Sequence, residues 1–199
     1  MMSKQIMIAI SREYGSGGHR IAEELAKKLN LPLYDRNLLD EIAEKKGYNK
    51  QYLEHFDESV QNPFTKRTVR GISNSHEDDV AQIQFQFLRE KAESGESFVV
   101  VGRCSDYILK PYEGLVSIFV SADMEFKIRR VEEHRGQDRK TAIKTIRKHE
   151  KARKFYHNTY CETRWGSLKG YDLCINSGKL GVDQTIDILQ KYVEARMQA

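Results

Sequence analysis

The chain has 199 residues, of which 39% are hydrophobic and 10% aromatic. This length supports one substantial core and is short for two ordinary domains with a linker, so we expect a single domain. Mean hydropathy is −0.66. Because no apolar run approaches the ~20 residues of a membrane span, and because residues 1–10 lack the long apolar stretch of a secretory signal, we expect no membrane association and a cytoplasmic location.

The net charge of +4 is concentrated in one block. Residues 127–154 contain twelve Lys and Arg against four acidic residues, a net charge of +8, whereas the remainder holds 21 basic and 25 acidic residues. Such a block is typical of a solvated helix face, a clamp on a polyphosphate or a nucleic-acid surface. It contains no Phe, Tyr or Trp that could stack on bases, which argues against nucleic acid.

The three cysteines are Cys104, Cys161 and Cys174. An odd number with no C-x-x-C pair argues against a disulfide framework and against a zinc site. We therefore expect reduced thiols, and we predict no metal-ligating residue.

The first half of the chain predicts strands and helices in alternation. The apolar run 6–10 is typical of a buried strand, and apolar residues then recur at a helical period from Ile21 to Leu29. A second short strand is predicted at 31–34, followed by a helix that ends at Gly47. Residues 48–74 are weakly patterned, so we expect a mobile segment there, before a helix capped by Ser75.

The second half continues the alternation. Strands are predicted at 98–101, 115–120 and 171–175, two helices at 124–134 and 141–160 are hinged near Gly136, and an amphipathic helix closes the chain at 182–193. This order predicts an α/β fold, a parallel five-stranded sheet with helices on both faces. Ligands bind such sheets at the carboxyl ends of the strands, which places residues 11–18, 35, 102–105 and 176 along one edge.

The stretch "SREYGSGGHR" (11–20) resembles two phosphate-binding patterns without matching either. In the P-loop pattern, with Gly17 as the second glycine, Gly18 stands at the lysine and His19 at the Ser/Thr. In the dinucleotide pattern Gly15 and Gly17 fit, but Arg20 replaces the third glycine. Both patterns use glycines that turn N–H groups inward at a helix N-terminus, so we expect an anion site. The alternative is a glycine turn that only connects strand to helix.

Several segments together resemble the cytidylate kinase-like family of the nucleoside monophosphate kinase group. They are "ISREYGSGGHRIAEELAKKLNLPLYDRNLL", "VVVGRCSDYIL", the "EKAR" of 150–153, the Trp165 region and "YDLCINSGKLG". The resemblance implies a P-loop kinase fold in one domain. Its core would be residues 1–35, 95–126 and 170–199, its acceptor-side insertion 36–94 and its basic helical lid 127–169.

The resemblance also implies roles for individual residues. Arg20 and Arg153 would be catalytic, and the acceptor would contact Arg12, Asp35 and Arg103. The nucleotide would be bound by Gly15, Ser16, Gly17, Gly18, His19, Arg20, Arg130 and Asn176. Two positions depart from the pattern of true cytidylate kinases, because Gly18 stands where they have the loop lysine and Cys104 where they have an aspartate.

The implied activity is transfer of the γ-phosphate of ATP, with Mg²⁺, to a nucleoside monophosphate such as CMP or dCMP. Such a reaction needs no general base, since the acceptor phosphate is already an anionic nucleophile, so arginines can do most of the work. Because the loop lysine is missing, the alternative is a nucleotide-binding regulatory protein on the same fold with little or no catalysis.

Overall fold

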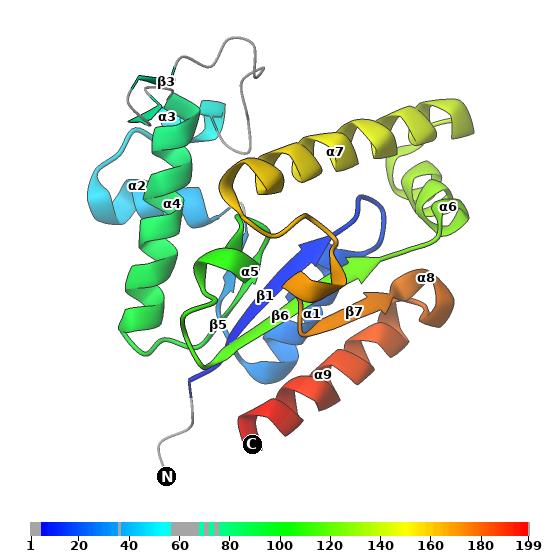
Figure 1. Ribbon diagram of the computed structural model, residues 1–199. Helices are drawn as coiled ribbons and strands as arrows, with labels where there is room; N and C mark the ends of the chain where they lie inside the picture. Colours follow the sequence, from blue (N-terminus) through cyan, green and yellow to red (C-terminus); the bar gives the residue numbers. More distant parts are fainter. Residues whose placement is uncertain (1–4, 36, 57–67, 70–71, 74–75, 199) are drawn as a thin grey trace.

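A computed structural model describes residues 5–35, 37–56, 68–69, 72–73 and 76–198. Its centre is a parallel five-stranded sheet in the order β2-β5-β1-β6-β7 (Figure 1). The strands are β1 Met7–Arg12, β2 Leu33–Tyr34, β5 Phe98–Val101, β6 Leu115–Ser121 and β7 Leu173–Asn176. In the register, Met7 pairs with Phe98 on one side and with Leu115 on the other. The predicted sheet is therefore confirmed.

Helices cover both faces of the sheet, which is why its central strands are continuously apolar. Alternate residues of β1 point to opposite faces. Ile8 and Ile10 pack with α1 (Gly18–Leu29) and α9 (Val182–Gln198), whereas Met7 and Ala9 pack toward the other face. That second face is covered by α2 (Leu38–Lys46), α3 (Lys50–Phe56) and α4 (His76–Glu93).

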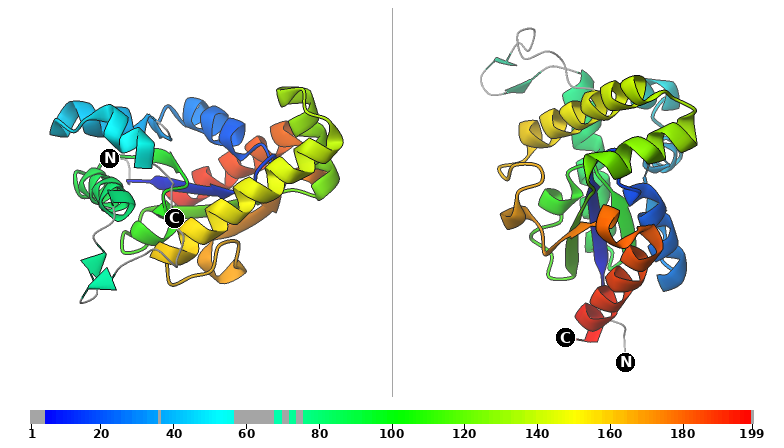
Figure 2. Two further views of the ribbon diagram at one scale, coloured as in Figure 1. Left: turned by 90° about the horizontal axis from the view of Figure 1, so that it is seen from above. Right: turned by 90° about the vertical axis from the view of Figure 1, so that its right-hand side faces the viewer.

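A hairpin of two helices lies across the carboxyl ends of the strands, as the views from above and from the side show (Figure 2). It consists of α6 (Met124–Arg135) and α7 (Arg139–Tyr160). Gly136 ends α6 with a left-handed φ of 59°. Asp138 caps α7, because its carboxylate accepts hydrogen bonds from the N–H (3.1 Å) and hydroxyl (2.6 Å) of Thr141. The two predicted helices and the break between them at Gly136 are both present.

The weakly patterned segment 48–74 contains structure that its sequence did not predict. The helix α3 buries Leu53 completely, and an antiparallel pair forms from β3 (Thr68–Val69) and β4 (Ile72–Ser73). These elements are too short to show a period. The rest of the predicted mobile segment and the Ser75 cap lie outside the described residues.

Three single-turn elements were also not predicted. They are α5 (Ser105–Ile108), the 3₁₀ turn Leu168–Gly170 and α8 (Ser177–Leu180). Among the described helices, none has the length and apolar character needed to cross a membrane.

Candidate active site

The glycine-rich loop lies between the central strand β1 and α1. Gly15 and Gly17 have left-handed φ angles of 82° and 81°. A Cβ on Gly15 would lie 3.1 Å from the Lys127 side chain, and one on Gly17 would lie 2.8 Å from Val182. Both positions therefore require glycine for conformation and for space.

Hydrogen bonds to Glu13 and Ser16 fix the conformation of the loop. The Glu13 N–H donates to the carbonyl of Val120 (2.9 Å), and the Ser16 hydroxyl donates to the carbonyl of Glu13 (2.9 Å). The hydroxyl of Ser177 donates to the carbonyl of Ser16 (2.6 Å). Since the first turn of a helix leaves N–H groups without intrahelical acceptors, α1 directs the positive end of its dipole at this loop. The predicted anion site has the geometry that it needs.

Gly18, the residue at the lysine position of the P-loop pattern, is buried against Arg12. A Cβ on Gly18 would lie 2.5 Å from Cβ and 3.0 Å from Cγ of Arg12, the last residue of β1. No side chain fits at position 18 in this packing. The stem of Arg12 occupies the space that a side chain at position 18 would need.

Two further predicted arginines approach the loop from the helical hairpin. The guanidinium carbon of Arg130, on α6, lies 3.6 Å from the position of a Cβ on Gly17. Burial, and then the charge of Arg20, lowers the pKa of Arg130. Arg153, on α7, donates to the carbonyl of Arg12 (3.2 Å), and its guanidinium lies 5.5 Å from the ring centre of Tyr14. Arg12, Arg130 and Arg153 are therefore brought together around the loop.

The side chains of Arg20 and His19 contact acidic residues outside the loop. The guanidinium of Arg20 forms an exposed 2.7 Å ion pair with Asp183 of α9. The ring of His19 lies 3.4 Å from the carboxylate of Asp35, which links the start of α1 to the end of β2. Asp35 and His19 are thus neighbours, whereas Arg20 pairs with Asp183 and still lies close enough to Arg130 for its charge to lower the pKa of that arginine.

Arg103 lies in a tight turn after β5, at the same edge of the sheet. Gly102, Arg103 and Cys104 have successive φ angles of 74°, 58° and 54°. Left-handed geometry costs a residue with a Cβ about 1–2 kcal/mol, so tertiary packing must hold this turn. Arg103 is only 4% exposed. Cys104 is also buried, at 3% exposure.

Asn176 ends β7 and caps α8. Its side-chain oxygen accepts from the N–H of Gly178 (2.9 Å), and its amide donates to Asp123 (3.3 Å). It lies at the predicted edge of the sheet, and these contacts give it a structural role there.

The sequence analysis missed a buried charge network beneath the loop. Lys127 is 4% exposed, and its ammonium group lies 3.0 Å from the Glu13 carboxylate and 2.7 Å from that of Glu150. Burial lowers the pKa of Lys127, but these two carboxylates raise it above its usual value. One signal existed, because Lys127 is four residues before Val131 and so shares the buried face of α6. The basic block is therefore not a uniformly solvated surface.

The carboxylates at this edge of the sheet bear on how it could hold Mg²⁺ that accompanies a nucleotide. Within the described ranges, no group of three or more His, Cys, Asp or Glu side chains could hold a metal ion. Mg²⁺ in nucleotide sites needs only one or two carboxylates besides phosphates and water. The half-buried Asp35 supplies one such carboxylate at the loop edge.

Comparisons with known proteins agree with this geometry. A family model described as the cytidylate kinase-like family matches residues 7–179. Proteins named cytidylate kinase from Pyrobaculum islandicum and Archaeoglobus fulgidus are 25% and 26% identical, over 94% and 95% of this chain and 92% and 95% of theirs.

Two solved structures extend the comparison. One, an uncharacterized protein from Eubacterium ventriosum, is 41% identical with a TM-score of 0.76, over 96% of this chain and 99% of that one. Shikimate kinase from Bacteroides thetaiotaomicron has a TM-score of 0.54 at 17% identity, over 95% and 98% of the two chains, and so shares the fold.

Proposed function

Because this chain belongs to the cytidylate kinase-like family, we propose that it is an ATP-dependent kinase that phosphorylates a nucleoside monophosphate. CMP and dCMP are the first candidates for the acceptor. The observation that carries the proposal is the convergence of three arginines, from β1, α6 and α7, on a glycine loop at a helix N-terminus. Such a site suits a transferring phosphoryl group, whose charge must be neutralised where water is excluded.

The donor side of the site is the glycine loop. The N–H groups from Gly15 to Arg20, which include those of Ser16, Gly17, Gly18 and His19, would bind the ATP phosphates together with the dipole of α1. Arg12 would supply the charge that the loop lysine supplies elsewhere. The packing of Gly18 against Arg12 supports this assignment, because it puts the Arg12 stem beside the position where a lysine would begin.

The hairpin would close the donor side. Arg130 and Arg153 would contact the transferring phosphoryl group, and Arg20 could join them only by leaving Asp183. Asn176 would lie near the base of the nucleotide. Residues 127–169 are accordingly proposed as the lid, and residues 36–94 as the insertion on the acceptor side.

The acceptor side would be formed by Arg103 and Asp35. Arg103 would hold the acceptor phosphate in line with the donor, because a guanidinium can form paired, charge-assisted hydrogen bonds to a phosphate. Asp35 would hold the Mg²⁺ that accompanies ATP, an ion that would neutralise phosphate charge. No general base is required, so positioning and charge carry the reaction.

The experiment has two arms. Calorimetry should show ATP binding that depends on magnesium, and a coupled assay over a panel of nucleoside monophosphates should identify the acceptor. Arg12→Ala and Arg153→Ala should each lower turnover by at least about tenfold, which corresponds to roughly 1.4 kcal/mol. Lys154→Ala removes an exposed charge from the same helix and should leave turnover unchanged. If no nucleoside triphosphate binds with or without magnesium, the proposal fails.

The second candidate is a nucleotide-binding regulatory protein with the same fold. Gly18 at the lysine position favours it, since the loop lacks the usual charge. Tight ATP binding without turnover of any nucleoside monophosphate would select this function over the kinase.

A further inference from the structure

The residue before the first glycine of the loop is held by the helical hairpin. The ring of Tyr14 stacks on that of His149, on α7, with ring centroids 4.3 Å apart and an angle of 6° between the planes. The guanidinium carbons of Arg135 and Arg153 lie 5.7 Å and 5.5 Å from the centre of the same ring. These contacts are favourable because the face of an aromatic ring attracts cations. Both α6 and α7 thus contact Tyr14.

Tyr14 also belongs to the apolar core of the hairpin. Among the described residues of this cluster, Tyr14 alone comes from outside α6 and α7. The half-buried Tyr14 and Ile143 pack against four residues that are at most 4% exposed, namely Ile128, Val131, Ala142 and Ile146. One aromatic side chain of the glycine loop therefore completes the packing between two helices that are distant from it in sequence.

The residues on either side of Tyr14 are attached to the same hairpin. The carboxylate of Glu13 accepts from the N–H of Ala122 (3.1 Å), which lies between β6 and α6, and pairs with Lys127 of α6 (3.0 Å). A Cβ on Gly15 would lie 3.1 Å from the backbone oxygen of Lys127. Because Glu13, Tyr14 and Gly15 are consecutive, the hairpin determines the path of the chain into the loop.

We propose that Tyr14 is a positioning residue for the phosphate site. Its ring anchors the start of the glycine loop in the core of the hairpin. It also supports the guanidinium of Arg153, which donates to the carbonyl of Arg12 (3.2 Å) beside the loop. The inference rests on the proposed function, in which the loop N–H groups and Arg153 bind phosphate, so Tyr14 acts through these groups.

The physical basis is preorganisation of the loop. A glycine-rich segment has many conformations open to it, yet Gly15 and Gly17 are both held in the left-handed region, with φ angles of 82° and 81°. A loop that already has its binding conformation loses less conformational entropy when an anion binds. Without the ring of Tyr14 the loop would sample other conformations, and ATP would have to order it.

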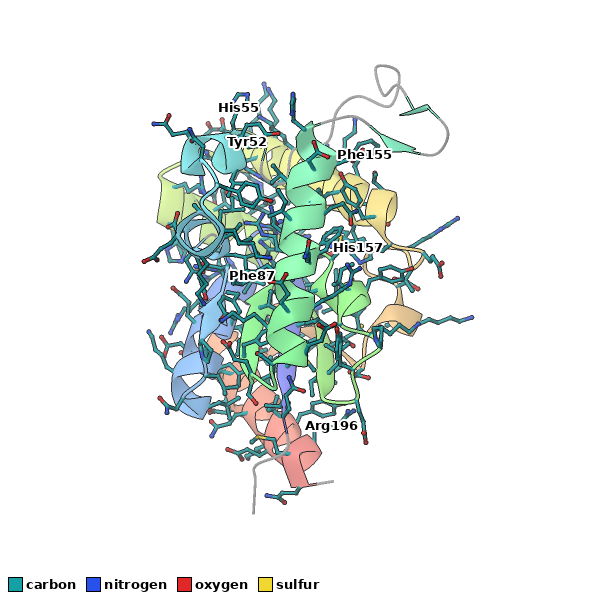
Figure 3. All side chains as sticks on the ribbon, turned by 90° about the vertical axis from the view of Figure 1, so that its left-hand side faces the viewer. Tyr52, His55, Phe87, Phe155, His157 and Arg196 are labelled. Atoms are coloured by element: carbon teal, nitrogen blue, oxygen red, sulfur yellow. The ribbon has the colours of Figure 1, made fainter. Side chains whose placement is uncertain are left out.

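Four variants separate this role from ordinary packing. Tyr14→Phe keeps the ring and its stack, whereas Tyr14→Ala removes both. Ile143→Ala removes an apolar side chain of α7 from the same cluster. Phe155→Ala removes an aromatic ring that is 37% exposed on the same helix, where it is labelled in Figure 3. The last two variants are controls, because they leave the ring of Tyr14 in place.

Calorimetry with ATP and magnesium measures the effect on binding. We expect Tyr14→Ala to weaken ATP binding by at least about tenfold, because the loop is no longer preorganised. Tyr14→Phe and both controls should stay within about twofold of the unmodified chain. In the coupled assay, Tyr14→Ala should raise the KM for ATP and leave the KM for the acceptor unchanged. If Tyr14→Ala does not fold, Tyr14→Leu, which keeps apolar volume without a flat ring, replaces it.

Two outcomes of the binding experiment would overturn the proposal. One is unchanged ATP affinity in Tyr14→Ala. The other is equal weakening in Tyr14→Ala and Ile143→Ala, which would show that the ring contributes packing alone.

A second measurement needs no nucleotide. NMR hydrogen exchange follows two N–H groups that flank the loop, that of Glu13, which donates to Val120 (2.9 Å), and that of Ile21, which donates to Gly17 (3.0 Å). Both should exchange at least about fivefold faster in Tyr14→Ala than in Ile143→Ala, because only the first variant releases the loop. Equal exchange rates would overturn the proposal. Failure of the unmodified chain to bind ATP would instead contradict the proposed function, and the exchange rates would still decide whether Tyr14 fixes the loop.

Discussion

At the scale of single residues, one close contact explains how the loop differs from a P-loop. Gly18 packs on Cβ and Cγ of Arg12, so the last residue of the strand before the loop occupies the space beside the first residue of α1. The two residues are therefore interdependent. A lysine at position 18, as in the P-loop pattern, would need the space that Arg12 occupies.

Gly18→Ala and Gly18→Lys should both be destabilising. The new Cβ would meet Arg12 at 2.5 Å, and overpacking of this kind costs about 1–3 kcal/mol. Urea unfolding measures the loss. Gly170→Ala is the matched control, because its Cβ would make only ordinary contacts at 3.5 Å with Thr163. Equal stability of Gly18→Ala and Gly170→Ala would contradict the steric argument.

Arg103→Ala should weaken acceptor binding by at least about tenfold, since a lost charge-assisted contact costs roughly 1.5–3 kcal/mol, and should leave ATP binding nearly intact. Calorimetry with each nucleotide measures both affinities. Arg103→Gly is the second variant, because glycine removes the guanidinium while relieving the positive φ of 58°. Equal loss of both affinities in both variants would show that Arg103 does not belong to the acceptor side.

At the scale of elements, the hairpin of α6 and α7 is held to the core at two distant points. Near the glycine loop, Lys127 joins Glu13 of the loop to Glu150 of α7. At the far end of α7, His157 pairs with Asp106 of α5. The sequence separations of 114 residues for Lys127–Glu13 and 51 for His157–Asp106 mean that folding alone creates these attachments.

Lys127→Met should destabilise the chain, because it leaves two carboxylates without their shared cation. Removal of one partner of a fully buried pair costs 3–5 kcal/mol, and since Glu13 and Glu150 are 24% and 21% exposed we expect about 2 kcal/mol. Chemical denaturation measures this, and hydrogen exchange should quicken in α6 and α7. Lys140→Met, which removes an exposed charge, should stay within about 0.5 kcal/mol of the unmodified chain. Equal free energies of unfolding for Lys127→Met and Lys140→Met would contradict the charge network.

The His157–Asp106 pair should make stability depend on pH. The pKa of His157 is raised in the folded chain to about 10, so the folded state holds a proton that the unfolded state releases. The stabilisation is complete below about pH 6.5 and declines as the pH rises toward the folded value. Cys161 has the opposite shift, a lowered pKa, and would mask part of this change between its folded and unfolded values.

Cys161→Ser therefore provides the background for the measurement. Its free energy of unfolding should fall between pH 6 and pH 9, relative to that of Cys161→Ser/His157→Gln. Asp106, which pairs with the ring, and Tyr171, which interacts with Asp106, are unchanged in both variants. Parallel stability curves for the two variants would mean that His157 is not held protonated by Asp106.

At the scale of the whole molecule, the parallel sheet brings every predicted site segment to one edge. Three elements supply the arginines around the loop, and two helical layers hold the sheet that positions them (Figure 1). A ligand that spans this edge contacts the core and the hairpin together. Its binding should therefore stabilise the entire fold rather than one part of it.

ATP with magnesium should raise the free energy of unfolding in a single transition. At one hundred times its Kd, a ligand that binds only the folded state contributes about 2.7 kcal/mol. Urea unfolding at increasing ATP concentrations measures the shift, and Arg12→Ala should need more ATP for the same effect. If the free energy of unfolding does not change with ATP concentration, the nucleotide does not bind at this edge of the sheet.

The sequence by itself determined the sheet, most of the helices and the edge where the site lies. Buried strands are continuously apolar and amphipathic helices have a 3.6-residue period, so β1, β5, β6, α1 and α9 could be found from local pattern alone. The glycines at 15 and 17 could also be assigned to a tight loop, and both have the left-handed φ angles that favour glycine. The elements it did not reveal, such as α3 and α5, are too short to repeat a pattern.

Only the tertiary structure decided which charged side chains are buried and which residue each of them contacts. Lys127 belongs to a basic block, yet it pairs with Glu13, while Arg20 follows the glycines but contacts Asp183. Likewise Cys104 and Cys161 are far apart in sequence and belong to one buried cluster. The physical reason is that periodicity reports burial along one element, whereas the partner of a buried polar group is set by how different elements pack.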